Sequence, residues 1–446
     1  MDLKGRTLAK LAKDLANGDT SSRQLTEAAF EAIQADPRAF TRIWSAPARA
    51  AADASDRLRA QGITPSPFAG IPISVKDLFD IYGEPTPAGS RILASGPIAG
   101  ADAHVVSRLR AAGFILVGRT QMSEFAFTGV GLNPHYPQPV NPCDPARAPG
   151  GSSGGAAVSV ALGQAAGAIG TDTGGSVRIP AAFCGLVGFK PTQRRVSREG
   201  VFPLSDSLDS IGPIANSADC CRVLDAVLAG EPLAPKSAGR VAGLRLGTPR
   251  QYLLEGLDAP VAAAFDKALS HLSSAGARIE PADFPELDSI PAMHRHGSIS
   301  NAEAFAYHRR RGLLDQRELY DPNVLTRVEA GKGMGAADYC DLLDARANLI
   351  EAARARMAPY DFLVAPTVPI LAPRLDALAD PAEFARLNGL TLRNTSVVNL
   401  IDGCAISLPI GGEDLPVGLM LIAKPMGDAR LLGAARAIEE VLRTSA

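Results

Sequence analysis

Residues 149–180 hold two glycine- and serine-rich clusters that flank an apolar, alanine-rich run, in the sequence PGGSSGGAAVSVALGQAAGAIGTDTGGSVRIP. Glycine and serine at this density are typical either of a flexible linker or of a place where backbone N–H groups approach a reacting or charged group. The run between the clusters, Ala156 to Ile169, carries Val158 and Val160 among small residues, a pattern that predicts a buried helix. A solvated linker would not contain such a helix. The stretch is therefore predicted to be a site built from two glycine-rich turns on either side of one buried helix.

The composition is that of a globular protein, with 446 residues, 46% of them hydrophobic and 21% charged, and a formal net charge of −2. A chain of this length can bury one large core or two to three ordinary domains. The near-neutral balance carries no electrostatic footprint for nucleic acid or an anionic membrane. The N-terminus is charged throughout, without the apolar core of a signal peptide, and no apolar run reaches the length of a membrane span. We expect a cytoplasmic protein with no nucleic-acid or membrane partner.

The cysteines and histidines give no pattern of metal ligands. Six cysteines are scattered without CxxC spacing, so the sequence predicts neither a zinc site nor a disulfide framework. His294 and His296 lie in an irregular MHRHG segment that has no carboxylate at ligand spacing, which favours a surface role over a metal pair. We expect no metal and no cofactor.

The periodicity of the apolar residues divides the chain into helices and short strands. Helices are predicted over residues 3–17, 22–34, 47–61, 103–112, 218–229, 261–275, 336–357 and 428–442. Strands are predicted over residues 71–76, 114–117, 243–248, 362–365 and 417–422. Residues 193–213 are predicted to form a polar loop, and residues 230–239, with two prolines and a lysine, are the most linker-like segment. The alternation of strands and helices through the centre favours an α/β sheet.

Two other glycine-dependent sites are excluded by sequence context. The chain has neither the GxxxxGK[ST] phosphate loop nor GxGxxG between a strand and a helix. Residues 151–155, GSSGG, satisfy the GxSxG pattern of a nucleophile elbow, which needs a hydrophobic strand before it and a histidine late in the chain. Here residues 141–149, NPCDPARAP, precede the pattern, and the last histidine is His308. The elbow is therefore excluded.

A serine nucleophile in the glycine-serine stretch would need a base other than histidine, because only His135 lies near the stretch in sequence. Lysine can serve if burial and its neighbours lower its pKa well below ~10.4. Lys76 ends an apolar strand in a segment with few other charges. Taken alone, the segment IPISVKD is also typical of an ordinary strand end that faces solvent. The residues leave both interpretations open.

Four segments together resemble the amidase signature family of hydrolases: GIPISVKD (70–77), PGGSSGGAAVSVA (149–161), GTDTGGSVRIPAAFCGLVGFKPT (170–192) and SLDSIGPIA (207–215). The resemblance covers most of the chain, as far as LPVGLMLI (415–422). It implies an α/β amidase signature fold, in which a large mixed twisted β-sheet is flanked on both faces by α-helices. It also implies one domain over 1–446, with a helical N-terminal segment over about 1–62, a core over about 63–230, and a part from about 240 to 446 that completes the same sheet.

The resemblance implies a Ser-cisSer-Lys triad. Ser176 would be the nucleophile, and Ser152, which follows a cis peptide bond, would bridge Ser176 to a neutral Lys76 that accepts the proton. The spacing of 24 residues between the two serines agrees with the family pattern. When a serine attacks an amide, negative charge develops on the carbonyl oxygen, and glycines let backbone N–H groups converge on it. The N–H groups assigned to this oxyanion hole are those of Thr173, Gly174, Gly175 and Ser176.

Three further residues are assigned supporting roles. Ser153 would join the same hydrogen-bond network, as the family suggests. Asp172 and Arg178 flank the second glycine turn, where a buried ion pair that holds the loop is favoured over a chemical role.

The substrate is expected to be a small carboxylic amide, and the activity that of a free-standing amidase. The alternative within the family is the A subunit of a glutamyl-tRNA or aspartyl-tRNA amidotransferase, a glutaminase that needs partner chains. In the transferase, the helix that resembles the one around Arg346 supplies an arginine for the glutamine carboxylate, although a helix-surface arginine fits as well. The segment 391–409 departs from the transferase pattern, because Ile401-Asp-Gly-Cys replaces its Ala-Gly-Leu-Pro run.

Arg393 and Asn394 lie in this divergent segment and are candidates for contact with a polar or carboxylated substrate. A binding protein that has lost the chemistry is disfavoured, because Lys76, Ser152 and Ser176 are all present. The oligomeric state is left open, with a homodimer as one candidate.

Overall fold

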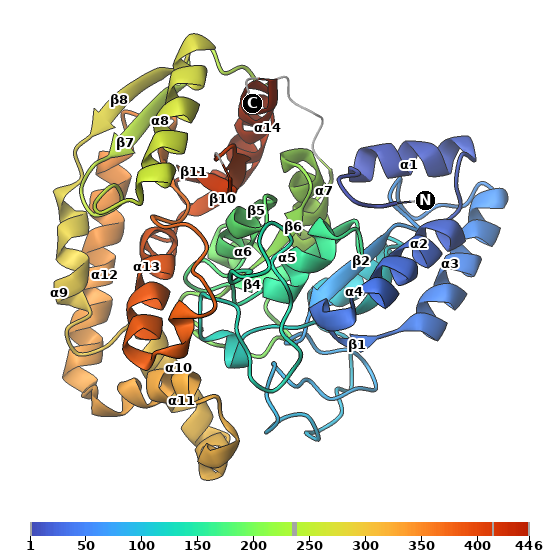
Figure 1. Ribbon diagram of the computed structural model, residues 1–446, viewed down its shortest axis with the longest axis horizontal. Coiled ribbons are helices and arrows are strands. Elements are labelled where there is room, and N and C mark those ends of the chain that lie inside the picture. The colour runs from blue at the N-terminus through green and yellow to red at the C-terminus, as the bar shows by residue number, and fades with distance from the viewer. Residues whose placement is uncertain (1, 234–238, 413, 445–446) are drawn as a thin grey trace.

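The computed structural model describes residues 2–233, 239–412 and 414–444 (Figure 1). One eleven-stranded sheet runs through this part of the chain, in the order β1-β3-β2-β4-β6-β5-β10-β11-β9-β7-β8. Its strands are β1 Phe40–Ile43, β2 Pro72–Lys76, β3 Ile115–Thr120, β4 Gly167–Asp172, β5 Val187–Lys190, β6 Ser210–Ala215, β7 Arg245–Pro249, β8 Arg278–Ala282, β9 Phe362–Pro366, β10 Cys404–Ile410 and β11 Val417–Ala423. Strand β2 is parallel to β3 and β4, and β7 is parallel to β8 and β9, whereas the other pairs are antiparallel. The mixed sheet that the resemblance implied is confirmed.

Helices occupy most of the sequence between the strands. They are α1 Leu8–Asn17, α2 Ser22–Ala35, α3 Ser45–Ala60, α4 His104–Ala111, α5 Gly154–Ala161, α6 Arg178–Phe183, α7 Ala218–Ala229, α8 Ala259–Ser274, α9 Ile290–Met293, α10 Ile299–Arg310, α11 Pro322–Glu329, α12 Ala336–Arg356, α13 Pro381–Leu400 and α14 Asp428–Thr444. In the described part of the chain, none of them is both long and apolar enough to cross a bilayer.

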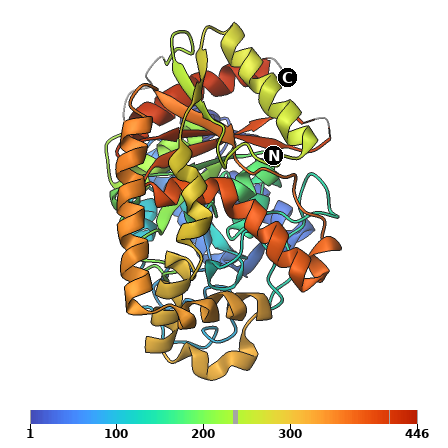
Figure 2. The same ribbon diagram turned by 90° about the vertical axis from the view of Figure 1, so that its left-hand side faces the viewer.

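Both faces of the sheet are buried, and β11 shows this residue by residue. Leu419 and Leu421 belong to the main apolar core, together with Leu431 of α14. Met420, which alternates with them along the strand, belongs to a second core that includes Val397 of α13. Successive side chains of a strand point to opposite faces, so α14 and α13 cover opposite sides of the sheet. Figure 2 shows these two helices on either side of the strands.

The run 156–169 is not the single helix that its apolar residues predicted. Helix α5 ends at Ala161, and Gly163 follows it with φ +69°. The chain then enters β4, which lies between β2 and β6 in the centre of the sheet. A short apolar, alanine-rich segment suits a buried strand as well as a buried helix, so periodicity cannot separate the two. The two glycine-serine clusters therefore flank a helix and a central strand.

The predicted loop over 193–213 is also wrong in its last part, because β6 begins at Ser210 and pairs with β4 and β5. Strand β10 and helices α10, α11 and α13 were not predicted. The other predicted elements are confirmed, although α1 begins at Leu8, where Thr7 caps it, and not at residue 3. The linker-like segment 230–239 begins at Gly230, which caps α7. Its residues 234–238 lie outside the described residues.

Candidate active site

Lys76 is the last residue of β2 and is fully buried, with 0% of the residue exposed. Its Nζ donates to Ser152 Oγ at 2.7 Å and to Thr171 Oγ1 at 2.9 Å. Burial lowers the pKa of Lys76 to about 7, although the negative charges of Asp209 and Asp172 act in the opposite direction. The solvent-facing interpretation of Lys76 is therefore wrong. Thr171, which sequence reasoning did not single out, is its second partner.

Ser152 is held in a tightly packed turn that leads into α5. The peptide bond between Gly151 and Ser152 is cis, as the resemblance implied. A side chain at Gly151 would meet the backbone of Gly131, because an added Cβ would lie 2.6 Å from its N and Cα atoms. Ser123 N donates to Ser152 O at 3.1 Å, which ties the turn to a neighbouring loop. The glycine before Ser152 is thus required by close backbone packing.

The second glycine cluster follows β4 directly, and Ser153 N donates to Ser176 O at 3.2 Å, which brings the two clusters together. Thr395 of α13 donates to Gly174 O at 2.6 Å. Gly175 has φ +135°, and an added Cβ would lie 2.1 Å from Thr395 Oγ1, so this position excludes any side chain. Among the described residues, no acceptor is bonded to the N–H groups of residues 173–176.

A buried ion pair braces this turn. Arg178 Nη2 lies 2.8 Å from Asp172 Oδ1 and Arg178 Nε lies 3.0 Å from Asp172 Oδ2, with both side chains 0% exposed. Asn399 Nδ2 also donates to Asp172 Oδ1, at 3.1 Å. Burial opposes ionisation of Asp172, but the charge of Arg178 outweighs it and lowers the pKa of the carboxyl below its ordinary value. Asp172 and Arg178 thus have positions suited to the supporting role assigned to them. Ser153 Oγ lies nearby and donates to Thr171 O at 3.4 Å.

Replacing Arg178 by methionine is expected to lower the free energy of unfolding by about 3 kcal/mol or more, because it leaves the Asp172 carboxylate buried without its partner. Urea titration followed by circular dichroism measures this change. The matched control is Arg354→Met, which removes an exposed pair with Glu351 and should change stability by less than about 1 kcal/mol. Equal effects of the two substitutions would contradict the bracing role.

Asp209 is a further acidic residue beside the turn, and it lies in the SLDS segment that carried part of the resemblance. It accepts hydrogen bonds from Thr173 Oγ1 at 2.5 Å and from the N–H groups of Leu204 and Ser205. Burial raises the pKa of Asp209 to about 6, although these hydrogen bonds lower it. Sequence reasoning quoted the segment but missed this residue, which fixes the side chain of Thr173.

A cavity of ≈ 230 Å³ opens at Ser176. Its lining includes Phe127, Gly174, Ser176, Arg327, Leu392 and Arg393. The structure thus brings Arg393 to the candidate nucleophile, as expected for a substrate-binding residue. Asn394, its neighbour, instead donates to the carbonyl oxygens of Leu253 and Pro366, both at 2.9 Å. Arg327 was missed, because a single arginine in a helix carries no signal of what it faces.

Arg346 does not line this cavity. Its guanidinium donates to Leu400 O at 3.1 Å and to Asn399 O at 3.2 Å, at the C-terminal end of α13. A cation at a helix C-terminus satisfies carbonyl groups that have no partner within the helix. The structure therefore gives Arg346 a positioning role, because the side chain of Asn399 contacts Asp172.

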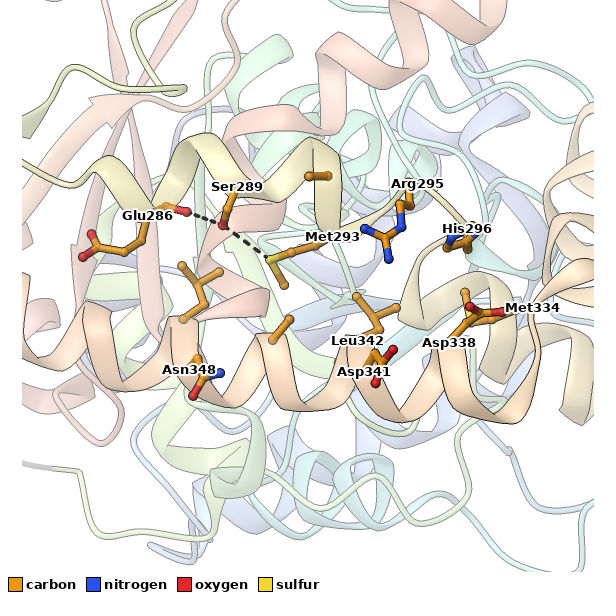
Figure 3. Close-up of a pocket in the computed structure, with 14 residues that line it drawn as sticks. Glu286, Ser289, Met293, Arg295, His296, Met334, Asp338, Asp341, Leu342 and Asn348 are labelled. Carbon is orange, nitrogen blue, oxygen red and sulfur yellow. Dashed lines mark hydrogen bonds between the residues drawn. The ribbon is translucent and has the colours of Figure 1, made fainter.

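The two neighbouring histidines line different hollows. His294 lines the cavity at Ser176, where burial lowers the pKa of the imidazole. His296 is exposed and lines a groove between α9 and α12, beside Arg295 and across from Asp338 (Figure 3). The expected surface role fits His296, whereas for His294 it is wrong. In the part of the chain that the structure describes, no three or more His, Cys, Asp or Glu side chains are grouped so that they could hold a metal ion.

Treatment with EDTA is expected to leave the rate of amide hydrolysis unchanged, because the described side chains form no metal-ligand group. The rate before and after dialysis against the chelator measures this. Loss of rate on chelation and its recovery with added Zn²⁺ or Mn²⁺ would contradict the prediction.

Comparison with known proteins identifies the family. The family model described as Amidase matches residues 24–432. The chain is 37% identical to 2-amino-5-chloromuconic acid deaminase of Comamonas testosteroni, over 89% of this chain and 86% of that one. It is 38% identical to the A chain of the glutamyl-tRNA(Gln) amidotransferase of Chloroflexus aurantiacus, over 94% and 93% of the two sequences. The crystal structure of an amidase superposes with a TM-score of 0.89 at 33% identity, over 98% of this chain and 100% of the other. Sequence and architecture agree over nearly the whole length, and the chain belongs to the amidase signature family of amidohydrolases.

Proposed function

We propose that this protein hydrolyses a small carboxylic amide to an acid and ammonia or an amine, through an acyl-enzyme on Ser176. The observation that carries the proposal is the contact between Lys76 Nζ and Ser152 Oγ, 2.7 Å long and fully buried. A lysine whose pKa lies at about 7 is neutral in a large fraction of molecules near neutral pH. A neutral amine has a lone pair that can accept a proton, and an ammonium has none.

In the proposed mechanism two hydroxyl groups connect the base to the nucleophile. Ser152 gives its proton to Lys76 and takes that of Ser176, whose oxygen attacks the amide carbonyl carbon. Collapse of the tetrahedral intermediate breaks the C–N bond, and the proton held by Lys76 returns through Ser152 to the leaving nitrogen. Water, activated by the same relay, then attacks the ester on Ser176 and releases the acid.

The N–H groups of Thr173, Gly174, Gly175 and Ser176 are proposed to stabilise the oxyanion. They have no acceptor among the described residues, which supports a role toward a ligand oxygen. The turn that carries them is fixed from two sides, by Thr395 on Gly174 and by Asp209 on Thr173. Donors fixed in advance need no rearrangement when charge develops, and one such donor contributes about 3 kcal/mol to the barrier.

The experiment that tests this function is an assay of the purified chain alone on a panel of small amides, with release of ammonia measured. Turnover of at least one amide, together with a covalent adduct of a serine-directed phosphonate on Ser176, is the expected result. Without turnover and without the adduct, a catalytically silent binding protein replaces the proposal.

A second candidate is the glutaminase component of a glutamyl-tRNA or aspartyl-tRNA amidotransferase. The 38% identity to the corresponding Chloroflexus aurantiacus protein over 94% of this chain favours it. It predicts no turnover by the isolated chain, and glutamine hydrolysis that appears only when the partner chains of the transferase are added. The same assay, run with and without those chains, separates the two candidates.

A further inference from the structure

Arg327 of α11 is a buried cation in the Ser176 cavity without an acidic partner among the described residues. Its Nε is buried and makes no hydrogen bond within the described structure. Its guanidinium lies over the ring of Phe127, 4.8 Å from the centroid, and both residues line the cavity. Burial lowers the pKa of Arg327 to about 10. A buried guanidinium without a counter-charge is unfavourable, and an anionic ligand removes that penalty.

Arg393 of α13 brings a second guanidinium to the same cavity. Its Nε donates to Asn394 Oδ1 at 3.1 Å, but its Nη2 is buried and has no partner among the described residues. Its guanidinium lies 5.8 Å from the centroid of the Tyr252 ring. Burial lowers the pKa of Arg393, whereas the charge of Glu255, which does not line the cavity, raises it. Like Arg327, this residue has an unused donor in a buried position.

The rest of the lining explains which ligand charge the cavity accepts. None of the described residues that line it is Asp or Glu, and its polar side chains are hydroxyl groups, such as those of Ser298 and Ser396, together with His294. A guanidinium has the planar fork geometry that pairs with a carboxylate. An ammonium group in the same cavity would meet two positive charges and no negative one, and in a partly buried site this repulsion is large.

We propose that the cavity takes an amide that bears a carboxylate and no ammonium group, and that Arg327 and Arg393 together determine this specificity. The inference rests on the proposed function for the identity of the scissile bond. The charges of the lining carry the rest. The inference also disfavours glutamine as the substrate, because glutamine brings an ammonium beside its carboxylate.

Three five-carbon amides isolate the two charges. Glutaramate has a carboxylate only, glutamine has the same carboxylate and an ammonium, and pentanamide has neither. We expect kcat/KM of the wild type for glutaramate to exceed those for the other two amides at least tenfold. Arg327→Met and Arg393→Met should each lower the ratio of kcat/KM for glutaramate to that for pentanamide at least tenfold. The lysine variants at both positions, which keep the charge, should restore part of the ratio, and the exposed Arg354→Met is the matched control.

A binding experiment separates failure of this inference from failure of the proposed function. Calorimetry with Ser176→Ala, which has no nucleophile, should show glutarate bound at least tenfold more tightly than glutamate, with the preference lost in a variant that also carries Arg393→Met. Turnover of pentanamide or glutamine as efficient as that of glutaramate would overturn the inference and leave the hydrolase standing. If no amide is turned over, the proposed function fails, and equal binding of glutarate and glutamate would overturn the inference as well. Circular dichroism of each variant shows whether it is folded, and the lysine variants decide where a methionine variant is not.

Discussion

Replacing Ser176 by alanine is expected to abolish amide hydrolysis and to leave Tm near that of the wild type. The substitution removes one oxygen from a side chain at the edge of the cavity, and the backbone hydrogen bond from Ser153 N to Ser176 O remains. Without the hydroxyl group no acyl-enzyme forms, so the loss should exceed about a thousandfold in kcat/KM, as for other nucleophiles that act as part of a unit. Ammonia release and thermal unfolding measure the two quantities.

The control for this substitution is a buried serine outside the site. Ser407 of β10 is fully buried, and its hydroxyl lies 2.7 Å from that of Thr367. Ser407→Ala removes a buried hydrogen bond, worth about 1 kcal/mol, without touching the relay, so it should lower Tm and retain activity. Residual turnover by Ser176→Ala above about a thousandth of the wild-type value would point to another nucleophile.

The local parts of the site were predictable from sequence, because local physical rules determine them. Alternation of Ile71, Ile73 and Val75 predicts the strand that carries Lys76, and this strand is buried on both faces. The glycines mark places where the backbone must approach closely, and Gly175 has no room for a side chain. Helices with strong periodicity, such as α7, were predicted to the residue.

The parts that were missed depend on contacts between distant segments. Thr395 reaches Gly174 across 221 residues of sequence, and no local pattern predicts this. Arg346 and Arg327 both look like ordinary helix arginines in the sequence. Packing alone directs the first to the end of α13 and the second into the cavity at Ser176. The same limit applies to β4, whose alanine-rich sequence fits a helix or a strand until its neighbours in the sheet are known.

Replacing Lys76 by methionine is expected to lower kcat by about a thousandfold or more, because the relay then has no proton acceptor. Methionine has a similar length and no charge to bury, so the variant should fold. Steady-state kinetics with the best substrate of the amide panel measure the loss. Retention of more than about a tenth of the wild-type kcat would contradict the role of the lysine as base.

The pH dependence tests the same lysine in two independent ways. Below its pKa of about 7, Lys76 is an ammonium and cannot accept a proton, so the wild-type rate should rise as the pH passes through about 7, and this limb should be absent from any residual activity of Lys76→Met. The free energy of unfolding gives a readout that needs no catalysis. Between pH 7 and about 10 the unfolded chain holds a proton on Lys76 that the folded site has released, so the lysine makes stability rise with pH across this window. Subtracting the unfolding curves of Lys76→Met from those of the wild type isolates this contribution. A difference that does not change with pH would mean that Lys76 is charged in the folded protein, and the relay would then lack its base.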